Sequence, residues 1–258
     1  MAEHDRRTIL KVLGAALPLW AITRSGAVAG GNPGALDRWA QNVADLNAAL
    51  RDGKVTNLEW QGRIAALQSD VDLSDLSRYL DFDRLTRSLQ FSTDLAETAD
   101  PKFPSHIDIG ASPRRWFLRF FGMRRGGAII PHVHNNMVSA HTIMSGSFRV
   151  RTFDRLADEP GDLAAVRLKR RINEAMGLGR TVTMSDDSHN GHWLVAKEDR
   201  SFTFDTGVIA ANPAREFGLK ANDYNMIFVD AAAGDQSSET IRAPVMTFDQ
   251  ARAKYAPG

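Results

Sequence analysis

Five of the seven histidines in this 258-residue chain fall in two short segments, and their spacing suits metal binding. The first segment holds His132, His134 and His141, and the second holds His189 and His192. Residues i and i+2 of a β-strand face the same side about 6.6 Å apart, so His132 and His134 can converge on one ion. Two imidazoles alone bind a metal weakly, so a third ligand must come from elsewhere in the chain.

The chain contains no cysteine, which excludes disulfides, thiolate ligands and a cysteine nucleophile together. A bound metal must therefore be held by histidines and carboxylates. A neutral set of nitrogen ligands suits Fe(II), Cu(II), Ni(II) or Zn(II), and ligand type alone does not select among them.

The elements that must position these histidines follow two patterns along the chain. Apolar residues recur at helical spacing over residues 34–52 and 72–89, and Thr56 with Glu59 forms a capping-box pattern before a further helical stretch. A short terminal helix is predicted over residues 247–255.

Beyond residue 101 short apolar runs alternate with Gly, Asp, Asn and Ser, a rhythm that predicts an antiparallel sandwich or barrel. The predicted strands cover residues 116–121, 128–130, 140–144, 148–153, 181–184, 192–196, 201–209 and 226–229. Residues 163–177 fit either a strand followed by a helical turn or an inserted loop.

The first histidine segment resembles the first motif of the cupin superfamily. That motif reads Gly, five residues, His-x-His, three or four residues, Glu, six residues, Gly. Gly126, His132, His134 and Gly146 fall at the required spacing. The resemblance covers residues 114–210, less than half of the chain.

Ser139 stands where the family usually has its Glu ligand, so that ligand is missing here. His141, two residues later, would lie on the same face of a strand. It could replace the Glu as a fourth ligand, or it could face a ligand or the substrate without binding the metal.

The second histidine segment resembles the family's second motif less closely. His192, followed by an aromatic and then apolar residues, matches the last ligand of that motif. The family's Pro-x-Gly is replaced by residues 187–189 and its closing Asn by Ala196. His189 is the rival third ligand, although a residue three positions from His192 should not share a face with it along one strand.

The resemblance implies a mainly β fold, a cupin-like double-stranded β-helix (jelly-roll barrel) with an N-terminal helical extension. We expect the helical extension over residues 30–100 and the barrel domain over residues 101–258. Cupins with three histidines and no Glu include oxygen-using enzymes that cleave carbon–carbon bonds or oxidise thiols. The resemblance therefore implies a metal-dependent dioxygenase acting on a small organic substrate, with an anionic one favoured. Its cofactor is expected to be a divalent metal, Fe(II) first, with Zn, Ni, Cu or Mn as alternatives.

Arg149 and Arg151, two residues apart in a predicted strand, could both face the barrel and clamp a substrate carboxylate. Ordinary surface charge is the alternative interpretation. With His141 they are the candidate catalytic residues. Two other functions stay open: a metal-assisted isomerase or hydrolase with His141 or His189 as general base, and a non-catalytic metal- or ligand-binding module with a closed coordination shell.

Residues 1–29 have the order of an export signal. A charged start, an apolar run over residues 12–22 and the triplet Ala27-Val28-Ala29 follow one another. Residues 6–11, Arg-Arg-Thr-Ile-Leu-Lys, resemble a bacterial twin-arginine signal. The resemblance implies export in the folded state by the twin-arginine machinery, to the periplasm or outside the cell.

The formal net charge is +1, from 32 Lys and Arg against 31 Asp and Glu. No basic surface is available to hold a phosphate backbone, so nucleic acid is not expected as a partner. We expect a small-molecule substrate instead. A homodimer stays open, because cupin sheets often pair edge to edge.

Overall fold

The computed structural model describes residues 33–109, 116–156, 164–214, 226–235 and 237–256. Residues 32–258 form one compact unit, to which every element below belongs. The predicted signal peptide, residues 1–29, lies outside the described residues. No helix in the described part of the chain is long and apolar enough to cross a membrane.

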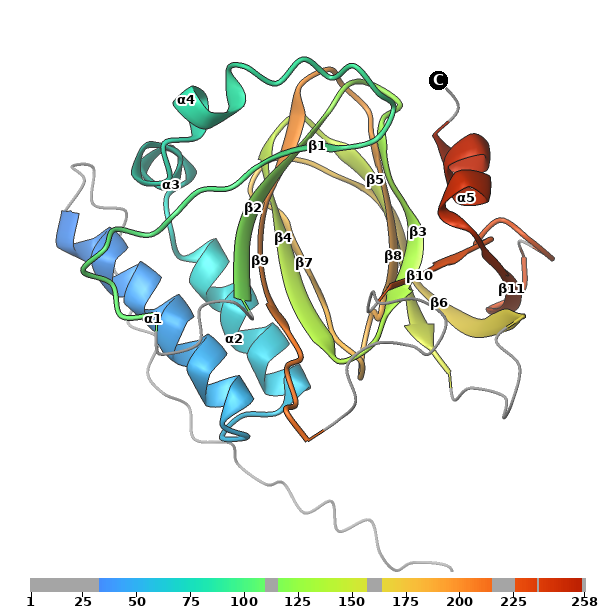
Figure 1. The fold of residues 1–258 in the computed structure, drawn as a ribbon, viewed down its shortest axis with the longest axis horizontal. Coiled ribbons are helices and arrows are strands. Elements are labelled where there is room, and N and C mark those ends of the chain that lie inside the picture. The colour runs from blue at the N-terminus through green and yellow to red at the C-terminus, as the bar shows by residue number, and fades with distance from the viewer. Residues whose placement is uncertain (1–32, 110–115, 157–163, 215–225, 236, 257–258) are drawn as a thin grey trace, which may run out of the picture. The chain divides into compact units, whose positions relative to one another are not determined.

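The strands from β2 to β9 are distributed over two antiparallel sheets that face each other (Figure 1). The first sheet has the order β2 (Trp116–Met123), β9 (Ser201–Ile209), β4 (Met137–Ser145) and β7 (Thr181–Met184), with β1 (Glu97–Ala99) on the edge beside β2. The second has the order β3 (Ala128–His134), β8 (Gly191–Ala196), β5 (Phe148–Arg155) and β6 (Ala165–Met176). Four strands of each sheet, joined in this order, form a jelly roll, as predicted.

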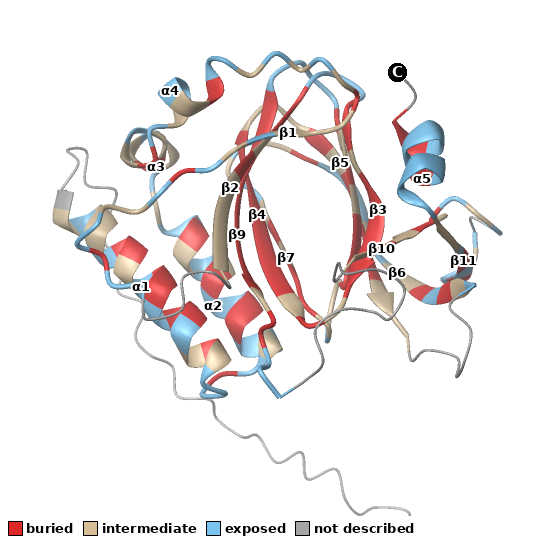
Figure 2. Cartoon of the chain, viewed as in Figure 1, coloured by how far each residue is buried: buried red, intermediate tan, exposed pale blue. Residues whose placement is uncertain are grey.

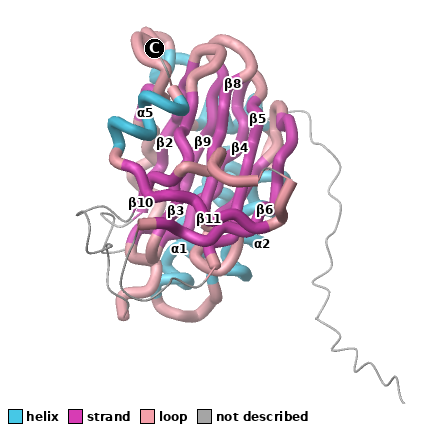
Figure 3. The backbone as a smooth tube through the Cα atoms, turned by 90° about the vertical axis from the view of Figure 1, so that its right-hand side faces the viewer, coloured by secondary structure: helices cyan, strands magenta, loops and turns pink. Residues whose placement is uncertain are grey.

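The second sheet closes into a barrel through β10 (Met226–Val229) and β11 (Thr240–Met246), which connect β6 back to β3. Figure 3 shows β10 and β11 beside β3 and β6. This barrel encloses its own apolar cluster, which includes Val133, Phe153 and Leu168. The segment that the sequence left ambiguous is thus the strand β6, in which buried Val166 and Leu168 flank exposed Arg167. The sequence did not predict β11.

Four helices pack against the outer face of the first sheet: α1 (Pro33–Arg51), α2 (Asn57–Ser69), α3 (Leu73–Tyr79) and α4 (Phe82–Thr86). Their apolar side chains form one cluster with Phe120, Phe202 and Phe204, and buried positions recur along α1 and α2 (Figure 2). The capping box of Thr56 and Glu59 is confirmed. The helical stretch predicted over residues 72–89 is not continuous. The chain forms α3 and α4 instead, because Asp81 adopts a left-handed φ of 56° between them.

The terminal helix α5 (Phe248–Tyr255) begins at a second capping box, formed by Thr247 and Gln250. It packs against the face of β3 and β8 that carries Ile130 and Trp193. The interior between the two sheets is a separate apolar cluster, which includes Met123, Ile143 and Leu194. The second sheet therefore has two buried faces, one towards the interior and one towards α5 and the closed barrel.

Gly207 allows β2 and β4 to approach β9 closely. A Cβ atom there would lie 2.5 Å from the carbonyl oxygen of Val138 and 2.6 Å from Cζ of Phe117. One of these contacts is to backbone, which cannot move without disturbing the β4–β9 pairing.

We therefore predict that Gly207→Ala lowers the free energy of unfolding by about 1–3 kcal/mol, the usual cost of an overpacked core. Urea denaturation followed by circular dichroism measures the change. Gly62→Ala is the control, because a Cβ there meets no atom within 4 Å and alanine favours the helix α2. Equal stability of the wild type and Gly207→Ala would contradict the predicted overpacking.

Candidate metal centre

His132, His134 and His192 meet between the two sheets. One ring nitrogen from each lies within 4.8 Å of the others, and the Nε2 atoms of His132 and His134 are 3.0 Å apart. The ring centroids of His132 and His192 are 4.1 Å apart. All three side chains are buried. Three imidazole nitrogens gathered in this way form a ligand set for a divalent metal. We call these residues the three-histidine group.

The register between β3 and β8 determines that these side chains meet. His132 lies directly opposite His192, and His134 follows it on the same face of β3. The pairing shifts between Ile129 and His132, where β3 carries one more residue than β8. Without that extra residue Pro131 would lie opposite His192, and both β3 histidines would face the other side of the sheet.

Asn190 holds the end of β3 in place. Its Nδ2 donates a hydrogen bond to the His134 carbonyl oxygen at 3.0 Å, and its Oδ1 accepts one from the His134 amide at 3.3 Å. Asp186 accepts hydrogen bonds from the Asn190 side chain and from the Asn136 amide. Sequence reasoning missed Asn190 and Asp186, because nothing in the chain order shows that the loop before β8 lies against the end of β3.

Two members of the three-histidine group, His132 and His192, are held in the neutral form that binds a metal. Nδ1 of His132 donates a hydrogen bond to the Ile130 carbonyl oxygen at 2.7 Å, which leaves the lone pair on Nε2. Burial lowers the pKa of His132 to about 4. Burial, together with the neighbouring histidines, also lowers the pKa of His192. Both imidazoles are therefore uncharged near pH 7, as metal coordination requires.

His141 lies beside the three-histidine group and is not part of it. It projects from β4 of the facing sheet, with its ring centroid 5.1 Å from that of His192. Its Nδ1 contacts the carboxylate of Asp205, a fully buried residue directly opposite on β9, and its Nε2 lies 3.3 Å from Oγ of Ser139. His141 thus lies between a serine hydroxyl and a carboxylate.

Asp205 was missed at the sequence level, although a signal was present. It is an isolated charged residue in the otherwise uncharged run of β9, Ser-Phe-Thr-Phe-Asp-Thr-Gly-Val-Ile. A charge in the middle of a strand that is buried throughout must be paired, so it indicates a partner across the sheet. The identity of that partner, His141, depends on the β4–β9 register.

The structure brings His192, and not His189, to His132 and His134. Nδ1 of His189 lies 2.7 Å from Oγ1 of Thr152, and its amide donates a hydrogen bond to Asp154. Its backbone is left-handed, with φ of 54°, in the loop before β8.

Arg149 and Arg151 do not face the interior, so the prediction that they clamp a substrate there is wrong. Strand alternation turns Thr152 towards His192, and it turns the two arginines to the opposite face of β5. The Arg151 guanidinium lies 3.9 Å from the ring centroid of Trp193, which packs against α5. Nε of Arg149 donates a hydrogen bond to the Asn173 side chain.

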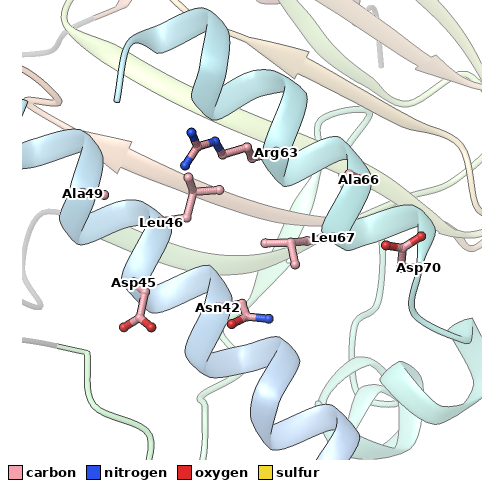
Figure 4. Close-up of a pocket in the computed structure, with 8 residues that line it drawn as sticks. All are labelled: Asn42, Asp45, Leu46, Ala49, Arg63, Ala66, Leu67 and Asp70. Carbon is pink, nitrogen blue, oxygen red and sulfur yellow. The ribbon is translucent and has the colours of Figure 1, made fainter. Parts of the chain in front are cut away.

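Two pockets lie outside the three-histidine group. One, of about 450 Å³, is a groove between α1 and α2 lined by residues such as Leu46, Ala49 and Leu67 (Figure 4). The other, of about 290 Å³, lies between the α1–α2 connection and the two loops that carry Asn136 and Asp186. None of the histidines in the described part of the chain lines either pocket.

The depressed pKa of His132 predicts how stability depends on pH. The folded state keeps this imidazole neutral down to about pH 4, whereas the unfolded chain takes up the proton near its ordinary value of 6.5. The unfolded state thus binds more protons between these values, so stability is full above pH 6.5 and falls as the pH is lowered towards 4. The whole effect is on the order of 3 kcal/mol.

Urea denaturation of chelator-treated protein at pH 7 and pH 5 measures this change. His132→Gln is the control, and we expect its free energy of unfolding to fall less between the two pH values than that of the wild type. An equal fall in both proteins would contradict the assignment to His132.

No protein-family model and no curated protein sequence matches this chain. Solved structures similar to parts of it include KdgF from Halomonas sp., at 19% identity and TM-score 0.26, over 36% of this chain and 69% of that one. A cupin superfamily protein from Desulfitobacterium hafniense matches at 11% identity and TM-score 0.30, over 48% and 86%. A double-stranded β-helix protein from Klebsiella pneumoniae matches at 13% identity and TM-score 0.32, over 54% and 89%.

Proposed function

We propose that this chain is a metal-dependent cupin oxidoreductase, a dioxygenase that acts on a small organic substrate. The observation that carries the proposal is the buried three-histidine group inside a jelly roll. Among the described residues no carboxylate belongs to that group. A divalent ion held by three neutral ligands keeps its full charge, which favours an anionic substrate at its remaining positions.

In this proposal His132, His134 and His192 hold the metal. When bound, Fe(II) supplies one-electron and O₂ chemistry, with Zn, Ni, Cu or Mn as the alternatives. The Ile130 carbonyl orients His132, and Asn190 fixes the backbone of His134. Apolar side chains of the interior, such as Met184 and Leu194, limit access of water to the group.

His141 acts in this proposal without binding the metal. The Asp205 carboxylate beside Nδ1 of His141 favours the tautomer protonated at Nδ1, in which the Nε2 lone pair faces Ser139 and the interior. His141 can therefore accept a proton from a substrate group at Nε2, while Asp205 stabilises the resulting charge.

The same serine–histidine–carboxylate order supports a second candidate, a metal-assisted isomerase or hydrolase that uses His141 as general base. The non-catalytic alternative required His141 to complete a closed coordination shell. It is less well supported, because His141 falls outside the three-histidine group and its Nδ1 lies against the carboxylate of Asp205.

We also propose that the protein is exported, and this rests only on the sequence of residues 1–29. A twin-arginine signal would carry the folded protein, with its metal already loaded, to the periplasm or outside the cell.

Elemental analysis of the full chain, purified without added metal, tests the ligand set. We predict about one equivalent of iron in the wild type, because one three-histidine group accommodates one ion. His132→Ala and His192→Ala should each lose the metal, because two imidazoles bind weakly. His141→Ala and His189→Ala should keep it. Thermal unfolding of each variant confirms that it is folded. A metal-free wild type, or retention in His192→Ala with loss in His189→Ala, would refute this site.

Oxygen uptake separates the two enzymatic candidates. We predict that the iron-loaded wild type consumes O₂ when it is given a small organic acid that serves as its substrate, and that His132→Ala does not. The hydrolase or isomerase candidate predicts instead that product forms equally fast without O₂. An oxygen electrode with parallel anaerobic assays makes the comparison.

A further inference from the structure

Arg119 is a cation on the inward face of the jelly roll. Along β2, Phe117, Arg119 and Phe121 share one face, and Phe120 lies on the other. Phe121 packs against the cluster between the sheets, and the ring of Phe117 lies against Gly207. Phe120 packs against the helices. The side chain of Arg119 therefore projects from the interior side of the sheet.

Arg119 lies in the same cross-strand row as His141. It is directly opposite Asp205 on β9, and Asp205 is directly opposite His141 on β4. Two strand spacings, about 10 Å, separate the Cα atoms of Arg119 and His141. The exposed fraction of the side chain falls from 39% at Arg119 to 0% at Asp205 and 6% at His141. Solvent therefore reaches this row from the Arg119 end.

The guanidinium of Arg119 is oriented and keeps one edge open. Asp100 accepts hydrogen bonds from Nε at 2.7 Å and from Nη2 at 3.3 Å. Within the described residues Nη1 has no acceptor, so the outer edge of the planar fork is open to a ligand. The guanidinium carbon lies 6.0 Å from the ring centroid of Phe121, a cation–π contact that further limits its rotation.

We propose that Arg119, between Phe117 and Phe121, is the carboxylate-binding subsite of the interior, and that the substrate is a small organic carboxylate. The fork of an arginine binds a carboxylate through two parallel hydrogen bonds, and the two aromatic rings cover an apolar body. The substrate's other end would lie towards the three-histidine group. The position of the substrate's other end rests on the proposed function, whereas the anion subsite depends only on residues of β2 and the strands beside it.

Asp205 does not oppose this role. Its carboxylate contacts Nδ1 of His141, on the side of β9 away from β2, and is fully buried. A ligand at the open edge of Arg119 meets the more exposed end of the row, where the neighbouring carboxylate is that of Asp100, already bound to the guanidinium.

Benzoate binding to the full chain tests the subsite, with neutral benzamide as the isosteric comparison. Isothermal titration calorimetry is performed on chelator-treated protein and on zinc-loaded protein. We expect tighter binding of benzoate than of benzamide, and roughly tenfold weaker benzoate binding in Arg119→Gln. Arg119→Lys keeps the charge without the fork and should lie between them. Arg149→Gln is the matched control, since Arg149 has the opposite orientation in the second sheet, and it should bind as the wild type does.

Thermal unfolding verifies that the variants are folded. If Arg119→Gln does not fold, Arg119→Lys is compared with the wild type in its place. Benzoate affinity unchanged in the Arg119 variants, an equal loss in Arg149→Gln, or no benzoate binding to the wild type would overturn the subsite. Arg119-dependent binding in a protein that takes up no metal would support the subsite and refute the proposed function. Metal uptake together with benzoate binding that does not depend on Arg119 would support the proposed function and refute the subsite.

Discussion

The pairing of β3 with β8 is the constraint on which the site depends. One additional residue in β3, between Ile129 and His132, places His132 opposite His192 and turns His134 to the same face. A shift of one residue in a strand moves every following side chain to the other face, because strand side chains alternate with a period of two. Asn190 then holds the end of β3 through both backbone groups of His134, so the register is maintained where the ligands lie.

Burial gives these histidines their chemistry. The second sheet is covered on its outer side by α5 and by its own closed barrel, and the first sheet is covered by α1 to α4. The histidines are therefore buried between the sheets, and this burial disfavours the charged imidazolium and lowers the pKa of His132 and His192. Neutral nitrogens with available lone pairs are the form that binds a metal.

The first sheet contributes a polar row to this apolar interior. A buried carboxylate is costly unless it is paired, and Asp205 is paired with His141, which in turn contacts Ser139. Arg119 continues the row towards solvent, where Asp100 binds it. The two sheets thus have different roles: the second carries the three-histidine group, and the first carries groups that can bind an anion and accept a proton beside it.

The sequence alone determined the elements with strong periodicity, such as the helix over residues 34–52, and the capping box at Thr56. It also determined that His132 and His134 share one face of a strand, through their i and i+2 spacing. It also indicated a jelly roll through a resemblance in motif. Only the tertiary structure decided which residues share the interior: Arg119 and Asp205 face it, whereas Arg149 and Arg151 lie on the opposite face of β5. The same holds for His192 over His189 as the neighbour of His132. The physical reason is that local spacing states which residues share a face, whereas strand register, bulges and the packing of the second layer determine which face is buried against what.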